Sequence, residues 1–432
     1  MIRKVFSKHI MAAGVLLLCA KFTASAQMAG ATRERTIDYK SYMEEVLKQN
    51  IGYAAEKLNI SVAEANIKAA QIFNDPELSV EYADNDDNRM QMGRSYSAEI
   101  SKTFSFGKRQ ANIDLAKSEK ELTDALLEDY FHALRAEATL AYFEAVMQTE
   151  LFRVKQQSCK SICDLARGDS IRYRLGEITQ VDALQSGLEA GISRNEVIQM
   201  RTELHNVYSS LGLWLGEFNS ETLLIPENKL VMSERTFNTE ELLQIALNNR
   251  ADLAAAMKNA DVARKALKVT KRERNMDFDV ALGYNYNTEV RNQEAPAPQF
   301  NGVTVGVAIP LKFSNFNRGA VLAAEHLAQQ AELNYRQAEL EVQTSVIQSL
   351  RQYKSLLEQV KNFENGLLQD AKTIIDGKMY SYERGETSLL EVLNAQRTHD
   401  ELHVNYIDTL YNCIVSLVEL ERNVGIWDIE IK

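Results

Sequence analysis

The sequence has little proline. Only five prolines occur in 432 residues, and none lies between Pro76 and Pro226 or after Pro310. A proline inside a helix costs about 3 kcal/mol, so the two proline-free tracts allow long helices. In the second tract apolar residues recur about every 3.6 positions: Val342, Val346, Leu350, Tyr353, Leu357, Val360, Phe363 and Leu367. Similar patterns run through 109–171, 180–215 and 388–422. The pattern predicts long helices that pack as coiled coils.

Several other features are missing. After the N-terminal region no run of 18 apolar residues occurs, which excludes a transmembrane helix and leaves a soluble chain or one that crosses a membrane as strands. The sequence contains no G-x-S-x-G, no phosphate-binding loop and no zinc-protease motif, so nothing indicates an enzyme, a catalytic residue or a cofactor site. The net charge of −11 argues against a nucleic-acid partner.

Residues 1–26 have the features of a secretory signal. Three basic residues precede an apolar run over 10–20, and a small-residue site ends at Ala26. We therefore expect cleavage between Ala26 and Gln27 and export of the mature chain. Cys19 follows a leucine rather than a small residue, so we do not expect it to be lipidated.

The mature chain has few residues suited to covalent or metal chemistry. Cys159, Cys163 and Cys413 are an odd number of cysteines, which does not suggest a disulfide framework. The first two lie one helical turn apart, are poorly placed to bond each other, and are expected to be small buried residues. His399 and His403 have the same spacing but no third ligand nearby, so we expect a solvated helix face and no metal site.

Four short segments alternate between apolar and polar or small residues. They read "ELSVEYA", "YSAEISK", "DVALGYNY" and "GVTVGVAIPL". A period of two predicts strands with one apolar face, long enough to cross a bilayer when tilted. We expect two hairpins, over 77–103 and 278–312, each with a polar loop. Two hairpins on a soluble sheet are the alternative.

The whole pattern occurs twice. "EVLKQNIGYAA" is matched by "IALNNRADLAA", and "LGEITQVDAL" at 175–184 is matched by "RGETSLLEVL" at 384–393. Each half reads as a helix, a hairpin, a long helix, a tight turn and a second helix. We expect a tandem duplication with repeats over 27–225 and 226–432.

The two turns, at 174–182 and 383–391, share a pattern. Each has a glycine suited to the left-handed end of a helix, then an N-cap hydroxyl, then an acid in capping-box spacing. These residues are Gly176, Thr179 and Asp182 in the first turn and Gly385, Ser388 and Glu391 in the second. A reversal of the chain does not require the shared Glu177 and Glu386, which suggests that the turns have a further role.

With this layout the chain resembles the TolC-type outer-membrane efflux proteins, the outer-membrane factors of tripartite efflux systems. The resemblance covers nearly all of the mature chain and rests on the duplicated layout and on the turns "YRLGEITQVDAL" and "YERGETSLLEVL". It implies a mainly α-helical homotrimer, in which a coiled-coil tunnel in the periplasm continues a shared 12-stranded β-barrel in the outer membrane. Strand number agrees, because four strands cannot close a barrel and eight leave no channel.

The resemblance also assigns roles to the turns. They would form the periplasmic tip that docks an adaptor protein, and through it an inner-membrane pump. The matching residues are Arg174, Leu175, Gly176 and Glu177 in the first turn and Tyr382, Arg384, Gly385 and Glu386 in the second. Asp182 and Glu391 would ring the periplasmic gate. The chain departs from the family at Thr387, where a basic gate residue is expected, and at Asn394, where a second acid is often found.

The implied function is passage of small molecules, such as drugs or metal ions, from the periplasm to the outside. The sequence has no His-rich or Met-rich cluster to favour metal ions over drugs. A duct for type I protein secretion is an alternative within transport. A non-conducting trimeric coiled-coil stalk or adhesin is the alternative outside it.

Overall fold

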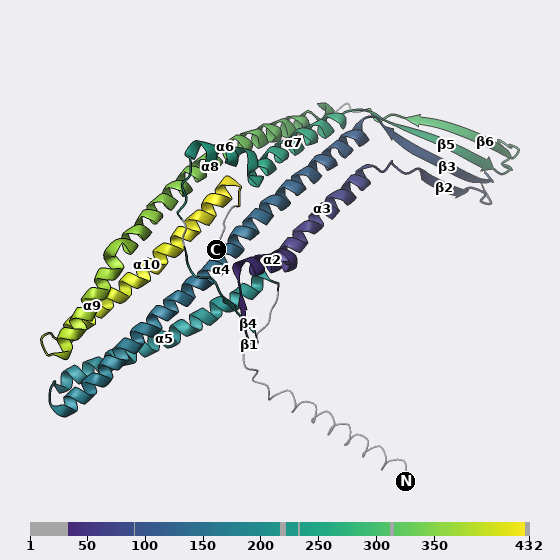
Figure 1. The fold of residues 1–432 in the computed structure, drawn as a ribbon. Helices are drawn as coiled ribbons and strands as arrows, with labels where there is room; N and C mark the ends of the chain where they lie inside the picture. Colours follow the sequence, from purple (N-terminus) through teal and green to yellow (C-terminus); the bar gives the residue numbers. More distant parts are fainter. Residues whose placement is uncertain (1–32, 90, 217–221, 232–233, 312–314, 428–432) are drawn as a thin grey trace, which may run out of the picture.

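The structure is a computed structural model that describes residues 33–89, 91–216, 222–231, 234–311 and 315–427. These residues form an elongated molecule with a β-sheet at one end and two helical turns at the other (Figure 1). The predicted signal, its cleavage site at Ala26 and Gln27, and Cys19 lie outside the described residues.

The sheet has four antiparallel strands in the order β2-β3-β5-β6. They are β2 (Glu77–Asp84), β3 (Arg94–Ser105), β5 (Asp277–Asn287) and β6 (Phe300–Ala308). All four predicted strands are present, and the two hairpins pair through β3 and β5. The prediction was wrong at the end of the last strand, which stops at Ala308 rather than continuing to Leu311. Pro310 has no amide hydrogen to donate to a neighbouring strand.

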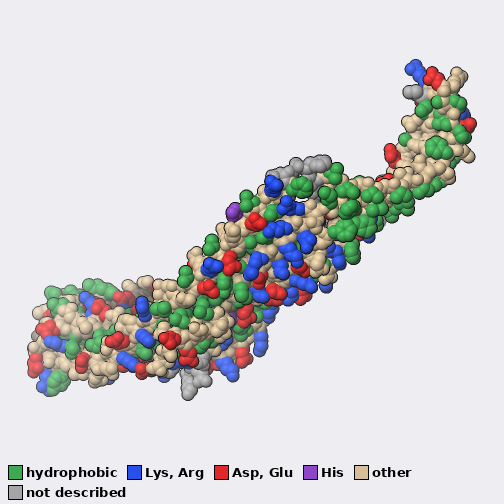
Figure 2. Space-filling model, turned by 90° about the horizontal axis from the view of Figure 1, so that it is seen from above, with side chains coloured by type: hydrophobic (Ala, Val, Ile, Leu, Met, Phe, Trp, Pro, Cys, Tyr) green, Lys and Arg blue, Asp and Glu red, His purple; other side chains and the backbone are tan. Residues whose placement is uncertain are grey.

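The register of the sheet separates apolar from polar side chains. One row across the strands consists of Leu78, Ile100, Leu282 and Val305, and the next row, on the opposite face, consists of Ser79, Glu99, Gly283 and Thr304. The apolar row is exposed, with Val305 at 71% and Leu78 at 68%. Figure 2 shows hydrophobic side chains gathered on the sheet and where it meets the helices, whereas the helical body mixes both signs of charge.

Two long helical hairpins extend away from the sheet (Figure 1). The first consists of α4 (Lys108–Leu175) and α5 (Gln180–Trp214). The second consists of α8 (Arg318–Asn362), a π-helical segment η2 (Phe363–Leu367), α9 (Leu368–Glu383) and α10 (Leu389–Val424). The hairpins pack together through α4 and α10, so their turns lie at the same end of the molecule.

The second hairpin corrects one prediction. The apolar pattern through Phe363 and Leu367 predicted a continuous helix, but the regular helix ends at Asn362. Gly366 has φ 143°, which residues with a side chain rarely adopt. The period of the apolar residues carries no information about such a local change in backbone conformation.

The single helix expected before each β-hairpin is in fact two helices. They are α2 (Tyr39–Gln49) with α3 (Ile51–Ala70), and α6 (Thr239–Asn249) with α7 (Ala251–Arg272). The breaks fall at Asn50 and Arg250, where the backbone is extended. They are 200 residues apart, as are the matching sequence segments.

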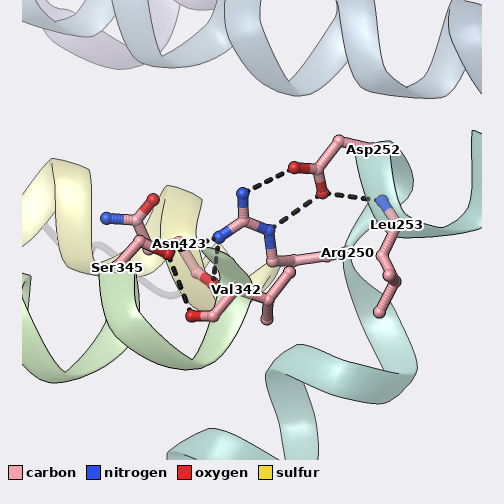
Figure 3. A network of polar contacts seen from close by, with 6 residues as sticks. All are labelled: Arg250, Asp252, Leu253, Val342, Ser345 and Asn423. Carbon is pink, nitrogen blue, oxygen red and sulfur yellow. Dashed lines mark hydrogen bonds and ion pairs between the residues drawn. The ribbon is translucent and has the colours of Figure 1, made fainter. Parts of the chain in front are cut away.

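The break at Arg250 is held by its side chain (Figure 3). The guanidinium binds both carboxylate oxygens of Asp252, at 2.9 and 2.6 Å, and donates to the hydroxyl of Ser345 on α8 at 2.8 Å. It also donates to the backbone carbonyl of Asn423 on α10 at 3.3 Å. Arg250 therefore ties the junction of α6 and α7 to both neighbouring helices.

The middle of the molecule contains a feature absent from the predictions, a parallel strand pair. β1 (Arg33–Ile37) pairs with β4 (Thr222–Pro226). The largest core cluster lies beside this pair and includes Tyr42, Tyr142 and Phe143. A short 3-10 turn, η1 (Asn315–Asn317), precedes α8. Within the described residues, none of the helices combines the length and apolarity needed to span a bilayer.

Candidate functional site at the two tips

The first tip is the turn between α4 and α5. Helix α4 ends at Leu175, and Gly176 takes a left-handed conformation with φ 79°. The amide of Glu177 donates back to the carbonyl of Arg172 at 2.9 Å, which closes the helix end. The side chains of Arg174, Leu175 and Glu177 are exposed.

The second tip, between α9 and α10, has the same construction. Gly385 has φ 74°, and the amide of Glu386 donates to the carbonyl of Ser381 at 2.9 Å. The guanidinium of Arg384 lies 4.2 Å from the ring centroid of Tyr380. Arg384 and Glu386 are exposed, so each tip presents one basic and one acidic side chain beside its glycine.

The predicted N-caps are also present. The side chain of Thr179 accepts from the amide of Asp182 at 3.2 Å, and its hydroxyl donates to the Asp182 carboxylate at 2.7 Å. Ser388 accepts from the amide of Glu391 at 3.4 Å. The caps begin α5 and α10, and both acids therefore lie in the first turn of a helix.

Tyr382 differs from the other residues predicted to dock an adaptor, because its side chain is only 5% exposed. Its hydroxyl donates to Oδ1 of Asp169 on α4 at 2.9 Å, and Asp169 is 1% exposed. Burial, and then the hydrogen bond to Asp169, raise the pKa of Tyr382. The pair joins the second hairpin to the first close to the tips. Tyr382 is therefore a buried residue behind the exposed tip residues.

Arg172 is a second link between the hairpins. Its guanidinium lies 4.9 Å from the ring centroid of Tyr382, donates to the Tyr382 carbonyl at 3.4 Å, and pairs with Glu177 at 3.4 Å. One cation therefore contacts both tips. Arg172 and Asp169 were not predicted, although Asp169 interrupts the apolar face that contains Leu165, which is a signal of a buried polar contact.

The two predicted gate acids have different surroundings. Glu391 accepts from Lys378 at 2.5 Å and from the hydroxyl of Thr387 at 2.7 Å. These contacts, led by Lys378, lower the pKa of Glu391. The carboxylate of Asp182 instead accepts from the hydroxyl of Thr179 at 2.7 Å. Lys378 was not predicted, and it offsets part of the charge that Glu391 would bring to a gate.

The histidines and cysteines lie farther from the tips along the helical hairpins. His399 and His403 were expected on a solvated face, but both are half-buried and line a cavity between α4, α9 and α10. Cys159 and Cys163 are half-buried, and Cys413 is buried. All three thiols are free, with 3.9 Å between the sulfurs of the first two.

Comparison with known proteins places these features in a wider group. Residues 242–425 match the family described as outer membrane efflux protein. The chain is 23% identical over 377 residues to the cobalt-zinc-cadmium resistance protein CzcC of Cupriavidus metallidurans, across 87% of this chain and 86% of that protein. It is 23% identical over 329 residues to the outer membrane protein TolC of Vibrio cholerae, across 73% and 70%.

Solved structures with the same fold include two channels. The fold is similar to that of CusC, with a TM-score of 0.74 and 17% identity over 93% of this chain and 96% of that one. It is also similar to the CmeC outer membrane channel of Campylobacter jejuni, with a TM-score of 0.73 and 14% identity over 89% and 85%.

Proposed function

The chain belongs to the outer membrane efflux protein family, and from this premise we propose that three copies assemble into one continuous duct. Each copy is an outer membrane efflux channel subunit of a tripartite system, and its helical part lies in the periplasm. The observation that carries the assembly is the four-stranded sheet, with one exposed apolar face and an edge strand on each side.

The sheet edges support a closed assembly. In the described residues β2 and β6 each have a single strand neighbour and run antiparallel to each other. β6 of one copy can therefore pair with β2 of the next without changing the alternation of directions. In lipid an unpaired edge leaves several backbone groups without hydrogen bonds, which favours closure by a ring of copies. Three copies give twelve strands, with the apolar rows toward lipid and the polar rows toward the channel.

The sheet also separates this function from the alternatives. A non-conducting coiled-coil stalk or adhesin has no need of four exposed strands that are apolar on one face. Among possible cargoes we favour metal ions, because a relative that matches 87% of the chain is named for cobalt, zinc and cadmium resistance. Drugs, and protein substrates of type I secretion, are the competing cargoes.

We assign adaptor docking to the exposed tip residues. They are Arg174, Leu175, Gly176, Glu177, Arg384, Gly385 and Glu386, with Tyr382 as a support beneath them. A tandem duplication of 27–225 and 226–432 gives each chain two similar tips, so a trimer offers six hairpin ends to its adaptor. Charged groups at such a rim mainly set partner choice and docking orientation. Asp182 and Glu391 form acidic rings at the periplasmic gate.

The test replaces both shared acids, as Glu177→Lys with Glu386→Lys. We expect the trimer to assemble and to resist heat as the parent does, because both side chains are exposed, while export in cells is lost. Glu119→Lys, an exposed change on α4 far from the tip, is the matched control. Normal export by the double variant would contradict adaptor docking at these acids.

Channel formation is measured separately. The purified protein should fractionate with outer membranes as a trimer and conduct ions in planar bilayers. A monomer, or a trimer without conductance, would contradict the duct whatever the tip variants do.

A further inference from the structure

A cavity of about 1120 Å³ lies between the two helical hairpins, above their tips. Its walls come from α4, α9 and α10. Two histidines of α10, His399 and His403, face this space one helical turn apart, with Asp400 beside them. The proposed duct does not use these three side chains.

The two imidazoles are already close together. Their ring centroids are 4.5 Å apart, with an angle of 51° between the ring planes. A metal ion about 2.1 Å from a ring nitrogen lies about 3.2 Å from that ring's centroid. Two rings bound at a right angle would then have centroids about 4.5 Å apart. His399 and His403 therefore have the separation that adjacent positions of a tetragonal or octahedral ion require.

Asp400 holds His399 in an orientation suited to binding. Its Oδ1 lies 3.3 Å from Nδ1 of His399 and accepts from the amide nitrogen of Gln396 at 2.8 Å. Its Oδ2 accepts from the hydroxyl of Ser158 on α4. A carboxylate on Nδ1 keeps the proton there and leaves the lone pair of Nε2 available, as for histidine ligands of metals generally.

The surroundings point to chelation rather than to attraction by a negative field. Basic side chains line the cavity at Arg153, Lys160 and Lys372, and acidic ones at Asp376, Glu383 and Asp400, so formal charges balance. The described residues contain no cluster of three or more metal-ligating groups. Water would therefore fill the remaining coordination positions.

We propose that His399 and His403 chelate a divalent transition-metal ion that prefers imidazole, such as Ni²⁺, in the cavity between the hairpins. Asp400 is the positioning residue, and the site is open and exchangeable because the protein supplies two ligands. The site is distinct from the tips and from the choice of cargo, since it concerns binding to the resting protein.

The test uses the purified full-length trimer without an affinity tag, titrated with Ni²⁺ by calorimetry. The three cysteines are changed to serine in every sample, because the thiol pair at 159 and 163 is a competing ligand set. We expect one saturable site per chain, lost in His399→Ala and in His403→Ala. Asp400→Asn should weaken binding about tenfold or more. His205→Ala, an isolated and exposed histidine on α5, is the control and should bind as the parent.

Equal binding by the His399→Ala and His403→Ala variants would overturn the proposal and leave a pair of packed rings. If either variant fails to assemble, the cysteine-free parent loaded with one equivalent of Cu²⁺ decides the question. Its electron paramagnetic resonance spectrum should show two equatorial nitrogen ligands, and a spectrum with oxygen ligands alone would overturn the proposal.

Discussion

The two long rods of the molecule have the same length but not the same continuity. From Arg109 to Gly176 the first half has one unbroken helix, whereas the matched stretch from Arg318 to Gly385 is interrupted by the π-helical segment η2. Both stretches cover 67 steps along the chain, so the interruption is not caused by an inserted residue. The position that matches Gly366 in the first rod is Gln157.

The difference shows that matched sequences can form helices of different continuity. Helix α4 packs against α3, α5, α7 and α10 along its length, whereas α9 packs mainly against α10. At the interruption the ring centroids of Phe363 and Tyr406 lie 5.9 Å apart, and the Tyr406 hydroxyl donates to Oε1 of Glu364 at 3.0 Å. We infer that the first hairpin is a fixed scaffold, and that the second can bend at Gly366 and is tied to the scaffold at its tip.

The largest effect is expected from breaking that tie. Tyr382→Phe removes the hydroxyl bound to Asp169, whose Oδ2 already has no hydrogen-bond partner among the described residues. A buried carboxyl left without its partner costs about 3 kcal/mol. We expect a clear fall in the thermal unfolding temperature. Tyr380→Phe, at an exposed ring two residues earlier, is the control, and equal unfolding of both variants would contradict the tie.

Exchanging the matched residues tests the joint. Gly366→Gln places a side chain at φ 143° and should cost about 2 kcal/mol. Gln157→Gly adds a glycine to a regular helix and should cost about 1 kcal/mol. Thermal unfolding of the two variants measures the difference. If Gly366→Gln lowers stability no more than Gln157→Gly does, the backbone at the two matched positions has no special conformational requirement.

The helix breaks at Asn50 and Arg250 offer a smaller test of the same comparison. Arg250→Ala removes charged hydrogen bonds to α8 and α10 and should cost about 1.5 kcal/mol. Asn50 caps α3 by accepting from the amide of Tyr53 at 2.8 Å, so Asn50→Ala should cost about 1 kcal/mol. Urea titrations of the separate variants measure the two losses in free energy of unfolding. A larger loss for Asn50→Ala would show that the break in the first half contributes more to stability.

The smallest effect concerns the acids behind the tips. Glu391→Ala should reduce cation preference in single-channel recordings, and Lys378→Ala should increase it by freeing Glu391 from its partner. Because Lys378 lowers the pKa of Glu391, the parent should lose its preference at a lower pH than the Lys378→Ala variant does. Reversal potentials in a salt gradient measure the cation preference of both variants and its pH dependence in the parent and in Lys378→Ala. An unchanged potential in both variants would leave these residues a capping role only.

What the sequence predicted was local. Alternation along each strand, the glycines at 176 and 385, and the hydroxyl caps depend on neighbours within a few residues, and the structure contains them except at the end of β6. The contact of Tyr382 with Asp169 joins residues 213 positions apart, and no local pattern specifies it. The same holds for the strand "RERTI", which has little apolar character and is a strand because of its distant partner.

That distant partner constrains the order of events as the chain folds. β1 is the first described strand to be synthesised, yet it cannot form its ladder until Thr222–Pro226 has followed it. Closing a loop of this length has an entropic cost that slows the step. The N-terminal strand therefore remains unpaired while the first hairpin folds. It pairs with β4 only when synthesis of the second half of the chain begins. A chain cut before residue 222 would keep β1 unpaired and exposed to proteases.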